Sequence, residues 1–428
     1  MTTRTVLVIN SGSSSIKYQL VDPDSGASLA SGLVERIGEE TGAITHKHDG
    51  GRFELVEPVP DHGFGLAEVL RIFAEQGPDL DEANIVAVGH RVVQGGRYFS
   101  GPALVDDDVV AKIEELVPLG PLHNPAHLKG IEVARRLLAD VPHVTVFDTA
   151  FFQDLPEEAA RYGLNREIAD KYSIRRYGAH GTSHHFVSGE VSALLGRDDL
   201  RQIVLHLGNG ASASAVVAGR AVETSMGLTP LEGLVMGGRT GDIDPAAVFH
   251  LARVAKMSID EIDRLFNRES GMKGLAGDND MREVWKRIDA GEREARDAMD
   301  IYLHRLVKYV GAYTAVMGGL DVLTFTAGIG ENDSRVRAEL CGRLAHMGIR
   351  FDAGANAVRA REPLTISTPE SSVIVMVVPT NEELTKIYTT SWPRWYSNQT
   401  PIIFSIRTGY RRTFRRIFTL RKKSANTH

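Results

Sequence analysis

Residues 6–20, VLVINSGSSSIKYQL, constrain the fold more than any other stretch of the chain. An apolar run ends in Asn10, a turn of serines and one glycine follows, and the next segment alternates apolar and polar residues, which predicts a β-hairpin. Successive N–H groups of such a turn can surround an anion, and Lys17 can place an ammonium beside it. The alternative is an ordinary hairpin tip with a surface lysine.

The same pattern recurs later in the chain. Residues 203–219, IVLHLGNGASASAVVAG, predict a second hairpin, and residues 323–332, LTFTAGIGEN, predict a third glycine turn after a strand. Three such turns favour a nucleotide site, although no Gly-x4-Gly-Lys-Ser/Thr loop is present. The run from Gly208 to Ala213 matches a loose dinucleotide fingerprint, but that fingerprint requires a helix where residues 211–217 alternate like a strand.

The remaining pattern predicts an α/β fold of two duplicated halves with a ligand cleft between them. Apolar strand-like runs alternate with amphipathic helices, of which one is predicted to be capped by Asn124 and another by Ser183. We expect an N-terminal domain over residues 1–149, a C-terminal nucleotide-binding domain over 150–384, and an atypical, poorly ordered basic tail over 385–428.

Composition restricts the classes of function. The chain has 428 residues, a net charge of −6 and a single cysteine, Cys341, so an intramolecular disulfide is excluded. No apolar run approaches the roughly 20 residues of a membrane span, and the N-terminus lacks a signal peptide, so we expect a cytoplasmic protein. Residues 384–428 hold ten Lys or Arg and no acid, so the rest is strongly acidic, which argues against nucleic-acid binding.

Several charged residues follow predicted strands or sit in glycine-rich turns. They are Arg91, Asp148, His180, Arg239 and the pair Glu382-Glu383. Each has an ordinary explanation: acids stabilise a helix start, and an arginine in a glycine loop is often a structural donor. Strand ends are nonetheless where open α/β sheets bind their ligands, so these residues are candidates for a shared site.

Ten stretches together resemble the acetate kinase family, in order and with its spacing over residues 5–384: NSGSSSIK, GHRVVQGG, PLHNPAHL, DTAF, RRYGAHGTSH, HLGNGAS, GLTPLEGL, GRTGDIDP, TAGIGEN and PTNEEL. The resemblance implies two RNase H-like domains of the acetate and sugar kinase, Hsp70 and actin superfamily. It also implies reversible phosphoryl transfer from ATP to acetate, dependence on Mg²⁺, which Mn²⁺ can replace, and a homodimer.

The resemblance further implies roles for individual residues. Arg91 and Arg239 would pair with the acid and the moving phosphoryl group, and His180 would stabilise that group. The resemblance implies that Asp148 is a proton donor or acceptor, but we expect it to orient an arginine or a metal-bound water. The acetate-like carboxylate is already ionised at neutral pH, so a strong general base is unnecessary. The remaining residues implied by the resemblance are the acyl pocket Val93, Leu122 and Pro230, and the metal ligands Asn10 and Glu382.

For the nucleotide, the resemblance implies a phosphate loop, an adenosine site and a lysine near the phosphates. These comprise His206, Leu207, Gly208, Asn209 and Gly210 for the loop, Asp280, Met281, Arg282, Gly328, Ile329, Gly330, Glu331 and Asn332 for adenosine, and Lys17.

The chain departs from the family pattern at Ala179, where phenylalanine is usual, and in the tail. Alanine would enlarge the acyl pocket, so a propionate or other short-chain acyl kinase is an alternative. Gln94, Phe152 and Gly238 also replace usual residues. The tail predicts either a basic aromatic anchor for anionic lipid or nucleic acid, or an altered reading frame.

Two rival functions share the predicted fold. A sugar kinase would need polar residues for several hydroxyls, whereas the matched acyl pocket is apolar. A non-catalytic ATP-binding module would not need two arginines directed at an acid, and acid-dependent ADP formation distinguishes it from a kinase.

Overall fold

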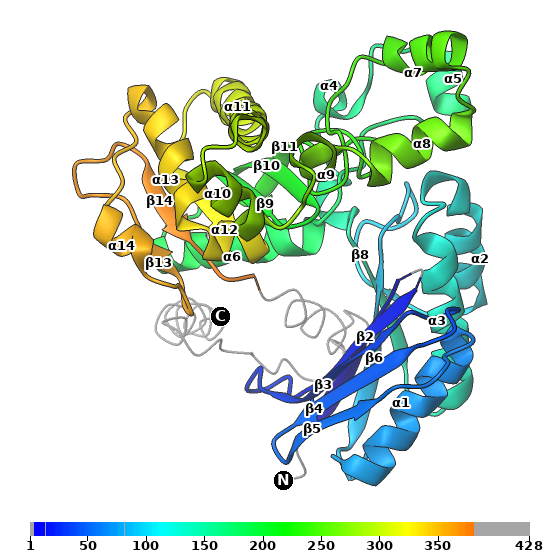
Figure 1. The fold of residues 1–428 in the computed structure, drawn as a ribbon. Helices are drawn as coiled ribbons and strands as arrows, with labels where there is room; N and C mark the ends of the chain where they lie inside the picture. The colour runs from blue at the N-terminus through cyan, green and yellow to red at the C-terminus, as the bar shows by residue number, and fades with distance from the viewer. Residues whose placement is uncertain (1–3, 13, 81, 381–428) are drawn as a thin grey trace, which may run out of the picture.

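The computed structural model describes residues 4–12, 14–80 and 82–380, which form two lobes, each built on its own β-sheet (Figure 1). The first hairpin lies in one sheet and the second hairpin in the other. The predicted α/β class is therefore confirmed, and Glu382 and residues 385–428 lie outside the described part of the chain.

The first sheet has the strand order β5-β4-β3-β2-β1-β6-β8-β7. Strands β1 and β2 pair antiparallel as the predicted hairpin, while β1, β6 and β8 run parallel. The strands are β1 (Thr5–Ser11), β2 (Ser15–Val21), β3 (Ser28–Glu35), β4 (Ala43–His48), β5 (Gly51–Leu55), β6 (Ile85–Val92), β7 (Ala103–Leu104) and β8 (His143–Phe147).

The second sheet has the order β11-β10-β9-β12-β14-β13 and repeats the scheme of the first. Again a hairpin, β9 with β10, is followed by parallel strands, β9 with β12 and β12 with β14, and an antiparallel edge strand closes the sheet. The strands are β9 (Arg201–Leu207), β10 (Ala211–Val217), β11 (Arg220–Thr224), β12 (Val322–Thr326), β13 (Leu364–Thr365) and β14 (Ile374–Val377). This repetition supports the predicted duplication, whereas the boundary between residues 149 and 150 remains a prediction.

Helices cover one face of the first sheet. Every second side chain of β1 and β2 points to this face, and these side chains, such as Ile9 and Tyr18, pack against apolar side chains of α1 and α3. Asp61 caps α1 by accepting from the Phe64 N–H. The helices are α1 (His62–Gln76), α2 (Asp107–Glu115) and α3 (Asn124–Leu137).

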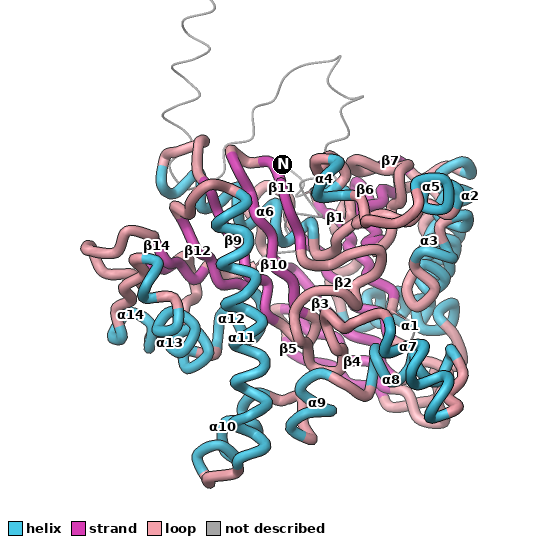
Figure 2. Tube along the Cα trace, turned by 90° about the horizontal axis from the view of Figure 1, so that it is seen from above, coloured by secondary structure: helices cyan, strands magenta, loops and turns pink. Residues whose placement is uncertain are grey.

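Helices cover both faces of the second sheet. The long helix α11 runs across one face (Figure 2), and α6 packs on the other, where Val187 and Val191 meet Val204 of β9. The strands are therefore buried on both sides and read as continuous apolar runs. The helices of this half are α4 (Glu157–Ala160), α5 (Arg166–Lys171), α6 (Gly181–Leu195), α7 (Ala246–His250) with a π-turn at Leu251–Ala255, α8 (Ile259–Arg268), α9 (Gly271–Ala276), α10 (Met281–Asp289), α11 (Arg293–Val316), α12 (Ala327–Asn332), α13 (Ser334–Arg343) and α14 (Ala353–Ala357).

Both predicted helix caps are wrong, for the same reason. Asn124 is the first residue of α3, and its side-chain amide instead holds the backbone N–H and carbonyl of Gln94. Ser183 lies inside α6, and its hydroxyl contacts His206. In both cases the side chain forms hydrogen bonds with a residue distant in sequence instead of capping the helix as local propensity predicts. The third glycine turn also differs, because residues 327–332 form the short helix α12 rather than an open turn.

No helix in the described part of the chain is long and apolar enough to cross a membrane. The single cysteine, Cys341, is buried in α13.

Candidate functional site

The predicted site residues of the first lobe gather at one edge of its sheet. Strands β1, β6 and β8 are parallel, and their register places Ile9 beside His90 and His90 beside Thr145. Asn10, Arg91 and Asp148 consequently come at or just beyond the carboxyl ends of neighbouring strands, where α/β sheets bind ligands.

Arg91 and Asp148 form a paired, partly buried unit. The Arg91 Nε lies 3.1 Å from each carboxylate oxygen, and Nη2 donates to Oδ2 at 2.5 Å. The Asp148 side chain is 2% exposed, while that of Arg91 is 20% exposed. Because a forked arginine pair fixes the plane of both groups, the carboxylate orients the guanidinium. Thr182 adds a longer contact to Asp148, 3.4 Å from its hydroxyl.

His180 belongs to a chain of buried hydroxyls and imidazoles. Its Nδ1 lies 2.9 Å from the Ser212 Oγ, and the same oxygen lies 2.7 Å from Nε2 of His184. Nδ1 of His184 in turn lies 2.7 Å from Ser214 Oγ. Burial, followed by the charges of His206 and Arg91, lowers the pKa of His180 well below its ordinary value. His180 is therefore neutral at pH 7.

The backbone of His180 is held in the left-handed region, with φ 58° and ψ 21°. Non-glycine residues rarely adopt this conformation, which is common at functional sites. It allows the next residue, Gly181, to donate its N–H to the carbonyl of Asp148 at 2.8 Å. A Cβ at Gly181 would lie only 2.2 Å from that carbonyl oxygen, so only glycine allows this approach.

The second hairpin reaches the same place. His206, the penultimate residue of β9, stacks on His180 with ring centroids 4.3 Å apart. A Cβ built on Gly210 would stand 3.5 Å from the His180 ring and 3.7 Å from Nη1 of Arg239. Gly210 therefore lies between His180 and Arg239, which brings three sequence-predicted residues together.

Arg239 lies in a long loop, which we call the Arg239 loop (residues 226–244). Its Nη1 donates to the Pro230 carbonyl at 3.3 Å, and the loop is attached to the second hairpin by the Gly237 N–H, which donates to the Asn209 carbonyl at 2.8 Å. Burial lowers the pKa of Arg239 from its ordinary value, although an arginine keeps its charge at pH 7.

The three predicted acyl-pocket residues lie on segments that meet at Gln94. Val93 is buried, and the Gln94 amide next to it donates to the Leu228 carbonyl at 3.4 Å, two residues before Pro230. Asn124 is hydrogen-bonded to Gln94, and this contact places the segment that contains Leu122 beside Gln94. Leu122 is 38% exposed. Gln94, a departure from the family pattern, thus connects the first lobe to the Arg239 loop.

Ala179 is 1% exposed and belongs to the apolar core of the second lobe. Its side chain does not open to solvent, which does not favour the expectation of a pocket enlarged for larger acids. Of the other departures, Phe152 is also fully buried and packs edge-on against His184.

Sequence reasoning missed two histidines of this region, although the stretch PLHNPAHL contains them. Burial, with the positive charges of Arg239 and Arg91, lowers the pKa of His123 to about 4. Burial and Arg91 lower that of His127 to about 3. Both imidazoles are therefore neutral, and they leave the arginine charges available for anions.

The predicted adenosine residues line one groove of about 730 Å³ between α10 and α12. Asp280, Met281 and Arg282 form one wall and Gly328, Ile329, Glu331 and Asn332 another, with Asn209 of the phosphate loop at one end. Gly330 is buried beneath the groove, and a Cβ there would meet the Phe325 backbone at 3.4 Å. Glu331 joins the start of α12 to the segment after β14, because its carboxylate accepts hydrogen bonds from the N–H groups of Ala327 and Thr380 at 2.9 Å.

Asn10 and Lys17 face each other across the first hairpin, on the sheet face opposite α1 and α3. Over the described residues, no group of three or more His, Cys, Asp or Glu side chains is arranged to hold a metal. Mg²⁺ binds few protein oxygens and keeps several waters, so the amide of Asn10 and the carboxylate of Asp148 at one sheet edge suit it. The other predicted ligand, Glu382, lies outside the described residues.

Known proteins resemble this chain over most of its length. The model of the acetokinase family matches residues 5–387. The acetate kinase of Corynebacterium aurimucosum is 55% identical over 384 residues, 89% of this chain and 95% of its own length. That of Streptomyces griseus is 56% identical over 385 residues, covering 89% and 93%.

Solved structures show the same fold. The crystal structure of Porphyromonas gingivalis acetate kinase is 42% identical, with a TM-score of 0.86 over 91% of this chain and 99% of that one. A propionate kinase from Francisella tularensis is 40% identical, with the same TM-score and coverage. The expected duplicated actin-like fold is confirmed.

Proposed function

Because this chain belongs to the acetokinase family, we propose that it is an ATP:acetate phosphotransferase whose chemistry takes place between Arg91, His180 and Arg239. The observation that carries the proposal is that Gly210 of the phosphate loop adjoins both His180 and Arg239, while the Arg91–Asp148 pair is joined to Gly181 through the Asp148 carbonyl. A propionate kinase is less favoured, because the matching family is the acetokinase family and relatives about 55% identical to this chain are named acetate kinase.

The reaction needs positive charge more than it needs a base. A carboxylate oxygen of acetate attacks the γ-phosphorus of ATP, a new P–O bond forms, and the bond to the β,γ-bridging oxygen breaks to release ADP and acetyl phosphate. Two anions must approach each other, and the main barrier is electrostatic. Arg91, oriented by Asp148, pairs with the acid and Arg239 with the phosphoryl group, while Val93, Leu122 and Pro230 enclose the methyl group.

His180 donates a hydrogen bond to the equatorial phosphoryl oxygens. This role requires a proton on Nε2, and the hydroxyl chain provides for it when Ser214 donates to His184, His184 to Ser212, and Ser212 to Nδ1 of His180. The imidazole then acts as a neutral donor, in agreement with its lowered pKa.

ATP lies with its adenosine in the groove between α10 and α12 and its phosphates against residues 206–210 and Lys17. Mg²⁺ neutralises phosphate charge when it is bound, and Asn10 and Glu382, with Asp148 nearby, would hold it through water. Asp148 accepts no proton from the substrate, because the acid is already ionised.

Two further features belong to the proposal. A homodimer is supported by exposed apolar side chains on one projecting part of the second lobe, Ile168 of α5, Phe249 of α7, and Val254 and Ile259 nearby. A cytoplasmic location is supported by the use of ATP and by the lone buried Cys341.

The test is acyl phosphate formation by the purified full chain, with Mg-ATP, hydroxylamine trapping, and acetate, propionate or butyrate. We expect hydroxamate and equimolar ADP with acetate, and less with the longer acids. Nucleotide binding without acid-dependent ADP would instead identify a non-catalytic ATP-binding module.

A further inference from the structure

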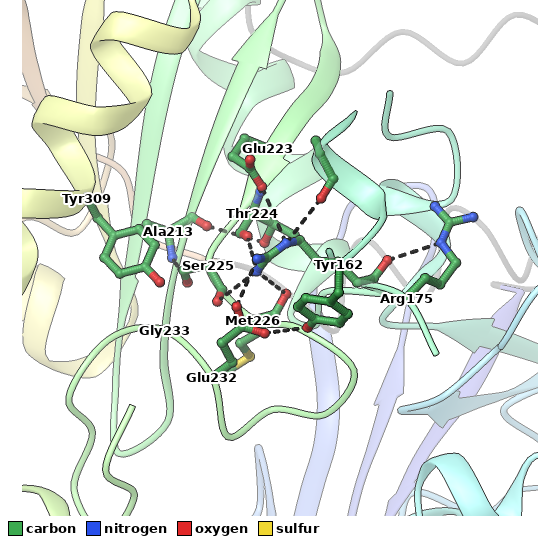
Figure 3. Close-up of polar contacts among 12 residues, drawn as sticks. Tyr162, Arg175, Ala213, Glu223, Thr224, Ser225, Met226, Glu232, Gly233 and Tyr309 are labelled. Atoms are coloured by element: carbon green, nitrogen blue, oxygen red, sulfur yellow. Dashed lines mark hydrogen bonds and ion pairs between the residues drawn. The ribbon is translucent and has the colours of Figure 1, made fainter. Parts of the chain in front are cut away.

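A partly buried polar network holds the Arg239 loop from outside the proposed reaction centre (Figure 3). At its middle is Glu232, whose carboxylate accepts from Nη2 of Arg176 at 2.8 Å and from the hydroxyl of Tyr162. The two donors come from the segment between α4 and α6, so this contact joins parts of the chain more than 50 residues apart.

Arg176 also binds the strand that leads into the loop. Its side chain is 16% exposed, and its Nη1 lies 3.0 Å from the Thr224 carbonyl, with those of Ser225 and Met226 at 3.3 and 3.5 Å. Nε donates to the carbonyl of Ala159 at 3.3 Å. The Arg176 guanidinium thus donates hydrogen bonds to three consecutive backbone carbonyls where the chain enters the Arg239 loop.

The start of the loop wraps closely around the carboxylate. The Tyr162 oxygen accepts from the Leu228 N–H at 2.9 Å while its hydroxyl donates to Glu232. A Cβ at Gly227 would lie 1.7 Å from the carboxylate and 2.1 Å from that hydroxyl, so a larger residue there would displace both groups from this arrangement. Residues 227–232 are therefore shaped by contacts that end on Glu232.

The one cation of the network, Arg176, lies between two glutamates, Glu232 and Glu223. Burial alone would lower the pKa of Arg176, but the charges of Glu232, Tyr162 and Glu223 raise it above its ordinary value. Glu223 lies 3.6 Å from Nε, and burial raises its pKa. The arginine consequently remains charged, and removal of the Glu232 charge would leave a buried cation without its closest partner.

The network connects the two halves of the proposed site. Arg176 lies four residues before His180, and the N–H groups of Tyr177 and Gly178 both donate to the Gly227 carbonyl, at 2.9 and 3.3 Å. On the other side, the Pro230 carbonyl, two residues before Glu232, accepts from Arg239. The distance between the His180 segment and the Arg239 guanidinium therefore depends on this set of contacts.

We propose that Arg176, Glu232 and Tyr162 are positioning residues, which set Pro230 and Arg239 against His180 and thereby determine how well the carboxylic acid is bound. This inference rests on the proposed roles of Arg239 and Pro230. The three side chains contact neither the adenosine groove nor residues 206–210, so ATP binding should not depend on them. Their effect on the acid, through Pro230, should appear in the acetate KM, and their effect on the moving phosphoryl group, through Arg239, should appear in kcat.

The test compares Tyr162→Phe and Glu232→Gln with the native chain, measuring kcat and the separate KM values for acetate and ATP. For Tyr162→Phe we expect the acetate KM to rise about fivefold, the equivalent of one hydrogen bond of about 1 kcal/mol, with the ATP KM unchanged. Glu232→Gln raises the acetate KM further and also lowers Tm. If Glu232→Gln does not fold, Tyr162→Phe still decides.

Tyr309→Phe is the matched control. Tyr309 donates its hydroxyl to both carboxylate oxygens of Asp242, 3.0 Å away, at the other end of the same loop. Asp242 also accepts from the Gly233 N–H at 2.9 Å, so loss of the Tyr309 hydroxyl weakens the loop next to Glu232 by a similar hydrogen bond. It leaves the contacts of Glu232 with Arg176 and Tyr162 in place. We expect a similar loss of Tm and no change in the acetate KM.

The outcomes are distinguishable. An equal rise of the acetate KM in Tyr162→Phe and Tyr309→Phe, or a rise in neither, overturns the positioning network. Arg239→Ala is measured in parallel. If its kcat and its KM values for acetate and ATP are native, the proposed role of Arg239 is wrong. If Arg239→Ala is impaired while Tyr162→Phe has native kinetics, only the positioning network is refuted.

Discussion

The Arg91 guanidinium lies within 3.1 Å of both carboxylate oxygens of Asp148, and Asp148 is almost completely buried. The two side chains come from parallel neighbouring strands, β6 and the end of β8, so the sheet brings them together. A buried carboxylate that already pairs with an arginine is better suited to orient it than to exchange protons with a substrate.

Asp148→Asn should therefore impair the acid side of the reaction. The amide keeps the shape of the side chain but removes the charge that Asp148 sets against Arg91, and losing one partner of a buried pair costs about 3–5 kcal/mol. We expect kcat/KM for acetate to fall at least about 100-fold, as measured by hydroxamate formation. Glu75→Gln, which breaks the exposed Arg71–Glu75 pair, is the control and should have normal kinetics. An Asp148→Asn enzyme with native kcat/KM would contradict the orienting role.

Gly210→Ala tests the placement of the reaction centre. The added methyl would make ordinary contacts of 3.5–3.7 Å with His180 and Arg239, so the protein should fold with a near-native Tm. The methyl occupies space between these side chains, so kcat/KM should fall by about 100-fold through misplacement of the phosphoryl group. Gly311→Ala, with open space around it on α11, should stay active and gain stability. Full activity in Gly210→Ala would place the transfer elsewhere.

Gly328→Leu tests the adenosine groove. Gly328 lines it, and no atom lies within 4 Å of a Cβ there, so a leucine side chain would extend into the groove without displacing protein atoms. We expect the KM for ATP to rise about tenfold or more while that for acetate stays the same. The matched variant is Gly342→Leu, an equally open position on α13 outside the groove. Equal ATP constants for both variants would show that adenosine does not bind here.

Buried histidines should make the protein sensitive to acid. Burial, aided by His143 and His127, lowers the pKa of His90 well below its ordinary value, and burial does the same for His184. Below the unfolded pKa of about 6.5 the unfolded chain binds protons that the native protein does not, so stability falls as pH falls toward the native pKa.

Urea unfolding between pH 7.5 and 5 measures this effect. Each such histidine contributes a slope of up to about 1.4 kcal/mol per pH unit below pH 6.5. His90→Gln should show a shallower slope than the native chain, whatever its stability at pH 7.5. An unchanged slope would mean that His90 does not titrate on unfolding.

The sequence by itself determined the hairpins, the α/β alternation and the order of residues around the site, because these depend on local period and turn chemistry. Arg91, Asp148, His180 and Gly210 could be chosen as candidates because they follow strands or sit in glycine turns, and parallel strands place such positions at one edge. The resemblance to a family supplied roles that no spacing could provide, and the groove between α10 and α12 agrees with its adenosine residues.

Only the tertiary structure decided which partners the polar side chains take. Asn124 and Ser183 have the chemistry of helix caps, yet one holds Gln94 and the other His206, because a buried donor or acceptor must be satisfied wherever the fold places it. Arg176 and Glu232 lie 56 residues apart and carry no local periodic signal. Their pairing depends on how a loop packs on a distant segment, and that is a property of the folded chain alone.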